Sequence, residues 1–129
     1  MSLEASDFWS RAVKALNTAK SLITKGPDAS ASRVYYAAFY TVSALFAKER
    51  KTFTKHSAVE SAVRRDLVKT RRWPVELGKK YTYLAELRIT GDYGGGLHVS
   101  EEDASKAVEF AGDILRQVGE EGPKYFPFE

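Results

Sequence analysis

The sequence predicts an all-α protein, an up-and-down bundle of four long helices and one shorter helix. Apolar residues recur every three or four positions in five segments, which is the spacing of one helix face. No segment alternates between apolar and polar residues over a length that would indicate a half-buried strand. The connections are mostly short, so consecutive helices should run antiparallel.

The first two helices are separated by Gly26 and Pro27, a strong stop signal. An apolar stripe over residues 8–23 predicts the first helix. Asp28 is suited to be the N-cap of the second helix, which is apolar over most of its circumference between residues 34 and 46. We expect this helix to be central, or buried on two sides by the bundle and by another subunit.

The third helix is predicted to be short and basic. A polar connection over residues 48–56 precedes it, and Ser57 and Glu60 have the spacing of a capping box. Apolar residues between positions 59 and 67 then form its stripe.

The fourth and fifth helices complete the predicted bundle. Pro74 suits the first turn of a helix that runs to about Thr90. Ser100 and Asp103 read as the cap of the last helix, which should end near Gly119 and has the cleanest apolar stripe in the sequence.

The length of 129 residues indicates a single domain over 1–129. Its helical core should span about residues 6–118, followed by a short C-terminal tail over 119–129. The end of the tail, "EGPKYFPFE", carries three aromatic residues and is too apolar for a plain disordered end. We expect the tail to pack back on the bundle or to meet a partner.

Composition indicates a cytoplasmic protein that does not enter a membrane. The sequence has no cysteine, and no apolar run approaches the roughly 20 residues of a membrane span. The first residues, "MSLEASDFW", do not resemble a secretory leader.

The charges are distributed unevenly. Residues 48–80 contain eleven Lys/Arg and four Asp/Glu, whereas residues 81–129 contain four Lys/Arg and ten Asp/Glu. A basic block favours a polyanion such as RNA, because neutralising phosphates releases counterions; the alternative is a set of solvated helix faces. The candidate RNA-binding residues in this block are Arg64, Arg65, Lys69, Arg71 and Arg72.

Several kinds of site are disfavoured by the sequence. The glycines at positions 91 and 94–96 lack the lysine and hydroxyl residue that follow the last glycine of a phosphate-binding loop. A zinc site would need distant carboxylates, because there is no cysteine and His56 and His98 lie far apart in the sequence. We therefore predict no metal site and no cofactor.

Arg88 is the unusual residue of the fourth helix. It continues the inward stripe of Leu77, Tyr81 and Leu84 just before the glycines, which are expected to form an elbow holding Asp92 and Tyr93. A cation on an apolar face suits a phosphodiester, whose oxygens gain charge during cleavage. The alternative is an arginine that snorkels and bonds the last carbonyls of its own helix.

The candidate catalytic residues are Arg88, Asp92, Tyr93 and His56. We assign Arg88 as the cation on the phosphate, with Asp92 orienting it. His56, beside a helix N-terminus, is the best candidate for an acid or base, because its ordinary pKa lies near neutrality. Tyr93 could stack on a base or hydrogen-bond a phosphate.

The second helix also contains polar aromatic residues. Tyr35 and Tyr36 are predicted to be core residues whose hydroxyls find a nearby carbonyl. Arg33 should lie near the helix start and pair with Asp28 or with the tail.

Four segments together resemble the small stand-alone HEPN-domain proteins of bacteria and archaea, over about residues 6–118. They come in the order and approximate spacing of that family. The segments are "SRVYYAAFYTVSALFA" (32–47), "KHSAVESAV" (55–63), "ELRITGDYGG" (86–95) and "VSEEDASKAVEFA" (99–111).

The resemblance implies a helical bundle that forms a homodimer and is often encoded beside a minimal nucleotidyltransferase, as a toxin and antitoxin pair. In active members it implies metal-independent RNA cleavage by an arginine followed, after four to six residues, by a histidine, in a cleft between two subunits. Arg88 matches the arginine, but Tyr93 stands five places on and His98 comes later. The sequence thus resembles the Asp-Tyr branch of the family, and the resemblance alone suggests the Tyr93 hydroxyl as a group that a partner nucleotidyltransferase modifies.

Three functions therefore remain open. The chain could be an RNA-directed HEPN protein and endoribonuclease toxin with an Arg88-centred cleft at a dimer interface. It could be a non-catalytic module that binds a nucleotide or a nucleotidyltransferase through the same cleft. It could also be a helical dimer without a ligand, in which Arg88 terminates a helix.

Overall fold

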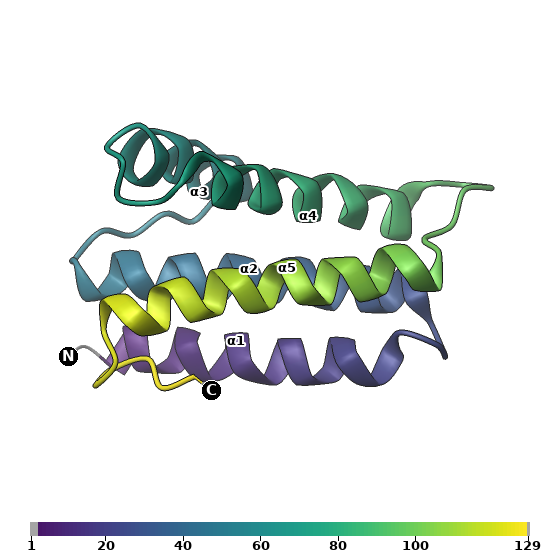
Figure 1. Cartoon of the computed structure of the whole chain (residues 1–129), viewed down its shortest axis with the longest axis horizontal. Coiled ribbons are helices and arrows are strands. Elements are labelled where there is room, and N and C mark those ends of the chain that lie inside the picture. The colour runs from purple at the N-terminus through teal and green to yellow at the C-terminus, as the bar shows by residue number, and fades with distance from the viewer. Residues whose placement is uncertain (1–2, 129) are drawn as a thin grey trace.

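The computed structural model describes residues 3–128, and its long helices form an antiparallel bundle (Figure 1). No strand occurs within this range. The elements are α1 (Leu3–Leu22), α2 (Pro27–Lys48), α3 (His56–Ala62), the π-helix η1 (Val63–Val68), α4 (Val75–Tyr93) and α5 (Glu101–Glu121). The predicted all-α fold, with four long helices and a shorter one, is confirmed.

Helix α2 lies at the centre of the bundle, where it packs against α1, α4 and α5. Small residues such as Ala37, Ala38 and Ala44 are fully buried along it, which lets neighbouring backbones approach closely. Two of its buried hydroxyls bond to backbone carbonyls: Ser30 donates to the Ala19 carbonyl at 2.8 Å and Thr41 to the Ala37 carbonyl at 2.7 Å.

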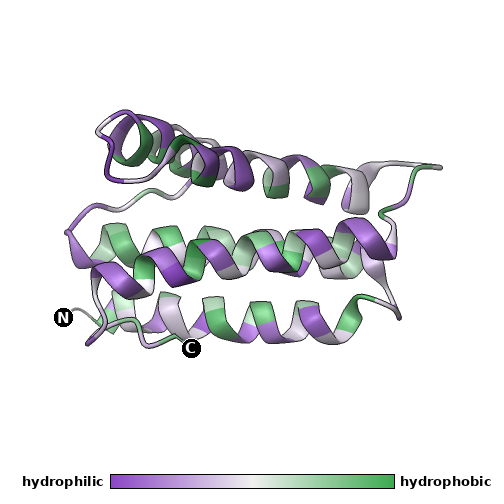
Figure 2. Ribbon diagram, in the orientation of Figure 1, coloured by the Kyte–Doolittle hydropathy of each residue, from purple (hydrophilic) through white to green (hydrophobic). Residues whose placement is uncertain are grey.

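In each outer helix, hydrophobic and hydrophilic residues alternate along the ribbon, as they do when one face is apolar and the other hydrophilic (Figure 2). This two-faced pattern is what a helix at the surface of a bundle requires. Within the described part of the chain, no helix is both long enough and apolar enough to cross a membrane.

The start of α2 differs from the prediction for Asp28. Gly26 is the N-cap and Pro27 takes the first helical position, where its missing N–H costs nothing. Asp28 lies in the first turn of α2, and its side chain contacts the segment before α5. Its carboxylate accepts a hydrogen bond from the Val99 N–H at 2.7 Å and contacts His98 Nδ1 at 2.8 Å.

The capping box predicted for the third helix is wrong. Helix α3 begins at His56, its N-cap is Lys55, and no side chain caps it. His56 is the first residue of the helix, and its ring packs on Phe39 of α2, with centroids 4.5 Å apart. The helix then widens into η1, which buries Val63 and Leu67.

Helix α4 runs three residues past the predicted end at Thr90, through Gly91 to Tyr93. Gly91 permits a close approach to α2, because a Cβ there would lie 2.8 Å from the Asp28 carbonyl oxygen. The chain turns only afterwards, with Gly95 at a φ of 62°. Gly91 therefore serves packing, whereas Gly95 serves the turn.

Helix α5 begins as predicted: the Ser100 hydroxyl accepts from the Asp103 N–H at 3.0 Å. It continues two residues beyond Gly119 and ends at Glu121.

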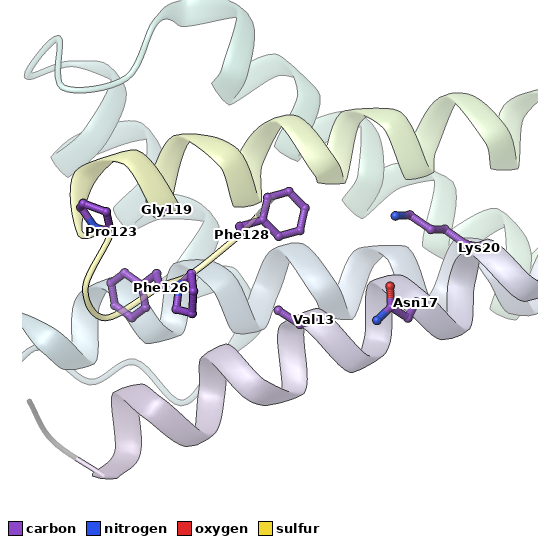
Figure 3. Close-up of a pocket in the computed structure, with 8 residues that line it drawn as sticks. Val13, Asn17, Lys20, Gly119, Pro123, Phe126 and Phe128 are labelled. Atoms are coloured by element: carbon purple, nitrogen blue, oxygen red, sulfur yellow. The ribbon is translucent and has the colours of Figure 1, made fainter.

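The tail packs back on the bundle. Phe126 is fully buried against Trp9, with ring centroids 5.1 Å apart, and the Trp9 indole N–H donates to the Pro127 carbonyl at 3.2 Å. The aromatic tail thus closes the end of the groove between α1 and α5. A hollow of about 670 Å³ remains beside it (Figure 3). Its lining residues are Val13, Asn17, Lys20, Gly119, Pro123, Phe126, Pro127 and Phe128.

Candidate functional site

Arg88 faces the aromatic residues of α2 and is largely buried. It follows the buried residues Leu77, Tyr81 and Leu84 on one stripe of α4, and its side chain is 18% exposed. Its guanidinium carbon lies 4.5 Å from the centre of the Tyr35 ring. The Nε atom is buried without a hydrogen-bond partner within residues 3–128. Arg88 therefore does not cap its own helix, and it retains a free donor.

Asp92 lies one turn beyond Arg88. Its Oδ2 atom is 3.9 Å from Nη1 of Arg88, an ion-pair distance that is too long for a hydrogen bond. The carboxylate is therefore placed to offset part of the arginine charge while leaving the guanidinium donors unused.

His56 joins this cluster through Tyr35. Its Nδ1 atom lies 2.9 Å from the Tyr35 hydroxyl, and its ring stacks on Phe39. Burial, and then the positive charge of Arg88, lower the pKa of His56 below its usual value of 6.5. The imidazole is consequently neutral at pH 7, the form in which a histidine can accept a proton.

Tyr35 is the centre of the cluster. Its side chain is buried and contacts both the guanidinium of Arg88 and the imidazole of His56. Burial raises the pKa of the Tyr35 phenol, and the charge of Arg88 opposes that rise. The buried Tyr81 hydroxyl is close enough for Tyr35 to affect its pKa but forms no well-aligned hydrogen bond. We call Tyr35, His56, Arg88 and Asp92 the arginine cluster.

The sequence analysis predicted correctly that Tyr35 is buried in the core, but it missed the contacts of Tyr35 with Arg88 and His56. The signal was available, because Tyr35 and Phe39 are four residues apart and so share a helix face. A histidine near the end of the next connection can then reach both rings.

Tyr93 lies apart from the other predicted catalytic residues. It is the last residue of α4 and is 72% exposed. The expected elbow around Asp92 and Tyr93 is wrong, since both belong to the last turn of α4. The structure thus brings together three of the four predicted residues, Arg88, Asp92 and His56.

Arg33 lies near the start of α2, as expected, but contacts a different residue from the ones expected. Its guanidinium carbon is 5.0 Å from the centre of the Tyr36 ring. It forms no ion pair with Asp28, whose carboxylate is engaged by His98 and Val99, nor with the described residues of the tail. The expected pairing is therefore wrong.

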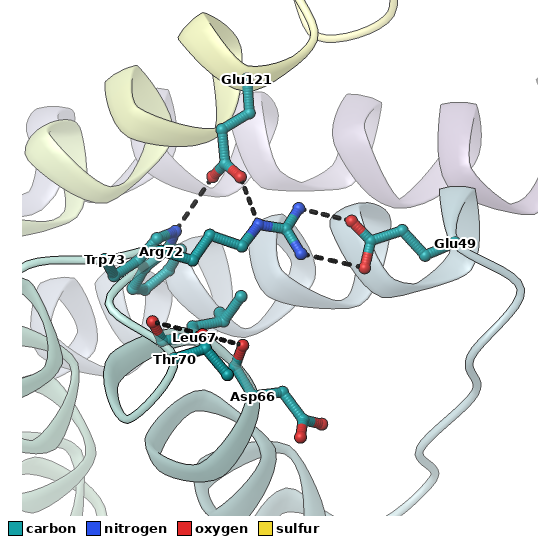
Figure 4. A network of polar contacts seen from close by, with 7 residues as sticks. All are labelled: Glu49, Asp66, Leu67, Thr70, Arg72, Trp73 and Glu121. Atoms are coloured by element: carbon teal, nitrogen blue, oxygen red, sulfur yellow. Dashed lines mark hydrogen bonds and ion pairs between the residues drawn. The ribbon is translucent and has the colours of Figure 1, made fainter.

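The predicted RNA-binding residue Arg72 is held by two carboxylates of the protein (Figure 4). Its guanidinium pairs with both oxygens of Glu49, at the end of α2, and its Nε donates to Glu121 at 2.6 Å. The Trp73 indole donates to the other Glu121 oxygen at 3.0 Å. Two carboxylates thus offset the charge of Arg72 and raise its pKa.

The other basic candidates are more accessible. Arg64 pairs with Glu60 at 3.3 Å and Arg65 with Asp66 at 2.8 Å, yet both side chains are more than half exposed. Lys69 and Arg71 are exposed, and no carboxylate of the described residues pairs with either. Of the five predicted RNA-binding residues, Arg64, Arg65, Lys69 and Arg71 therefore remain accessible to a polyanion.

Other candidate sites are weaker. The described residues contain no group of three or more His, Asp or Glu side chains that could hold a metal ion. The hollow beside the tail is lined by none of the predicted site residues. The predicted residues Arg88, Asp92 and His56 therefore lie in the arginine cluster, and none of them lines that hollow.

The bundle and its arginine cluster define a small α-helical protein with a polar site beside its central helix. The family model described as "HEPN domain" matches residues 5–121, and the chain belongs to this family. Two relatives are named UPF0332 proteins. One, from Thermotoga maritima, is 40% identical over 84% of each chain, and one from Gloeobacter violaceus is 35% identical over 84% of this chain and 87% of its own.

Two further proteins resemble this chain. A Methanocaldococcus jannaschii protein named "Putative toxin MJ0142" is 32% identical over 60% of this chain and 52% of its own length. The crystal structure of TT1696 from Thermus thermophilus matches with a TM-score of 0.78 and 20% identity, covering 92% of this chain and 98% of that one. At this identity the second likeness shows the fold.

Proposed function

We propose that this chain is an RNA-directed HEPN protein that binds a phosphodiester at Arg88 and cleaves RNA as a metal-independent toxin. The observation that carries the proposal is the position of Arg88, a buried cation with an unused Nε donor beside a neutral histidine. The membership of the HEPN family and the relative named as a toxin support it.

The cleavage step needs a base, a cation and a leaving group. A neutral His56 accepts the proton of the ribose 2′-hydroxyl while the 2′-oxygen attacks the adjacent phosphorus. The bond from phosphorus to the 5′-oxygen breaks, and this oxygen takes a proton from solvent. The products are a 2′,3′-cyclic phosphate and a 5′-hydroxyl. Arg88 stabilises the charge that develops on the phosphate oxygens.

Tyr35 would hold the His56 ring in place through Nδ1. When Nδ1–H donates to the Tyr35 hydroxyl, the lone pair lies on Nε2 and is free to accept a proton. Tyr35 is thus a positioning residue in this proposal, and its stacking on Arg88 fixes the guanidinium plane.

A second candidate function is a non-catalytic module that binds a nucleotide or a nucleotidyltransferase antitoxin. It is favoured by Tyr93, which stands where active relatives are expected to carry the histidine, and which is exposed on α4. In either case we propose a homodimer through the end of α4, because Ile89 and Tyr93 in its last turns are 53% and 72% exposed.

Replacing Arg88 tests the proposal. Arg88→Ala should abolish RNA binding and growth inhibition without loss of helical content measured by circular dichroism. The matched control is Arg116→Ala on α5, which removes an exposed arginine paired with Asp113 and should leave both properties unchanged. Cleavage is measured with a chelator present.

The outcomes separate the candidates. Cleavage by the wild type but not by Arg88→Ala would support the ribonuclease. Arg88-dependent binding without cleavage would support the non-catalytic module. Equal RNA binding by wild type and Arg88→Ala would contradict the role assigned to Arg88.

A further inference from the structure

Arg33 supplies a second cation beside the arginine cluster. Its guanidinium carbon lies 5.0 Å from the centre of the Tyr36 ring, and that of Arg88 lies 6.0 Å from the same centre. Tyr36 is only partly buried, as is Arg33. Two guanidinium groups, one from α2 and one from α4, thus share one partly accessible aromatic ring.

The positive charge at this ring is only partly balanced by the described residues. Asp92, 3.9 Å from Arg88, is the one carboxylate of residues 3–128 within ion-pair distance of either arginine. Glu60 is near enough to affect the pKa of Tyr35, but it is paired with Arg64. Like charges held close together favour an anionic ligand that contacts both.

We infer that Arg33 binds the phosphate next to the one held by Arg88, so that the site takes two consecutive phosphates of single-stranded RNA. This inference rests on the proposed function and specifies its substrate. A guanidinium pairs edge to edge with one phosphate, so two guanidiniums on a shared tyrosine ring can each take one phosphate of the same strand. The ring of Tyr36, which both guanidiniums contact and which is only partly buried, offers a surface on which a base can stack.

Arg11 provides a matched control. Its guanidinium carbon lies 5.9 Å from the centre of the Tyr40 ring, and the Tyr36 and Tyr40 rings are themselves neighbours, 5.8 Å apart. Unlike Arg33, Arg11 is paired with a carboxylate, Asp7, at 3.0 Å. Arg11→Gln therefore removes the same charge and the same kind of ring contact from a cation that is already partnered.

The test measures the binding of three probes: a single-stranded RNA with 2′-O-methyl groups that prevent cleavage, AMP and ATP. Arg33→Gln should weaken RNA binding about tenfold or more, because a charge-assisted contact is lost. It should also reduce the slope of log K against log salt by about 0.7, the value for one phosphate contact on a single strand. AMP binding should be unchanged, and Arg33→Lys should restore most of the slope.

Three results would overturn the inference. The first is an RNA affinity and salt slope that Arg33→Gln leaves unchanged, or changes no more than Arg11→Gln does. The second is an equal loss for AMP, which would indicate a general disturbance of the site. The third is an equal loss for ATP and RNA, which would indicate recognition of a nucleotide polyphosphate. Failure of the wild type to bind RNA at all would instead defeat the proposed function, and this inference with it.

Discussion

At the scale of single residues, the contact between Tyr35 and His56 links an aromatic core to a titratable group. The Tyr35 hydroxyl and Nδ1 of His56 are 2.9 Å apart, and the imidazole stacks on the ring of Phe39. Such a histidine is held in its neutral form by its surroundings, so protonation should disturb folding as well as any chemistry.

His56 should therefore make stability depend on pH. Because its pKa is lower in the folded protein than the ordinary 6.5, the unfolded state binds the proton more readily. The contribution is fully present above pH 6.5 and is lost as pH falls toward the folded pKa. We expect the free energy of unfolding to decrease between pH 7.5 and 5.5 more in the wild type than in His56→Gln, measured by urea denaturation.

The control for this experiment is His98→Gln, at the exposed histidine beside Asp28. It should not remove the decrease attributed to His56. An identical pH dependence in wild type and His56→Gln would show that the imidazole is not held neutral by folding.

At the scale of elements, the junction between α4 and α2 depends on Gly91. Alanine is normally the better helix former by about 1 kcal/mol. Here its Cβ would lie 2.8 Å from the Asp28 carbonyl, a backbone atom that cannot move alone. Gly91→Ala should therefore lower the free energy of unfolding by about 1–3 kcal/mol, as overpacking does, measured by urea or thermal denaturation.

Gly96 is the matched control, because nothing lies within 4 Å of a Cβ built there. Gly96→Ala should change stability by less than about 1 kcal/mol. If both variants were equally stable, the close approach between α4 and α2 would be refuted. Since α4 carries Arg88, Gly91→Ala should also weaken RNA binding.

The same junction shows what the sequence could and could not predict. The helices, their order and the Ser100 cap follow from apolar periodicity and local capping chemistry, which act within a few residues. The place of Gly91 inside α4 could not be predicted, because this glycine packs against Asp28, far away in the sequence. Arg88, His56 and Asp92 could be identified as site residues from the chemistry of their side chains alone. Tyr35 and Arg33 were missed as site residues, because only their contacts with other segments bring them to the site.

At the scale of the whole molecule, the tail packs against α1, so that the two ends of the described chain are in contact. Phe126 is fully buried and packs on Trp9. Phe126→Ala should lower the free energy of unfolding by about 3–5 kcal/mol, because it leaves a cavity in the core. Denaturation followed by tryptophan fluorescence measures this loss.

Tyr125→Ala is the control, since Tyr125 is 40% exposed. It should cost much less than Phe126→Ala. Equal and small effects of the two variants would mean that the tail contributes little to the stability of the bundle.

The contacts of the Asp28 carboxylate with His98 and Val99 have a practical consequence for the loop between α4 and α5. The loop is fixed on one side by the last turn of α4 and on the other by this carboxylate, so Gly95 and Gly96 stand clear between two anchored points. Because the sequence has no cysteine, Gly96→Cys would create a single thiol for a fluorophore. A dye placed there, eight residues beyond Arg88, would test in real time the proposed binding of RNA or of a second subunit.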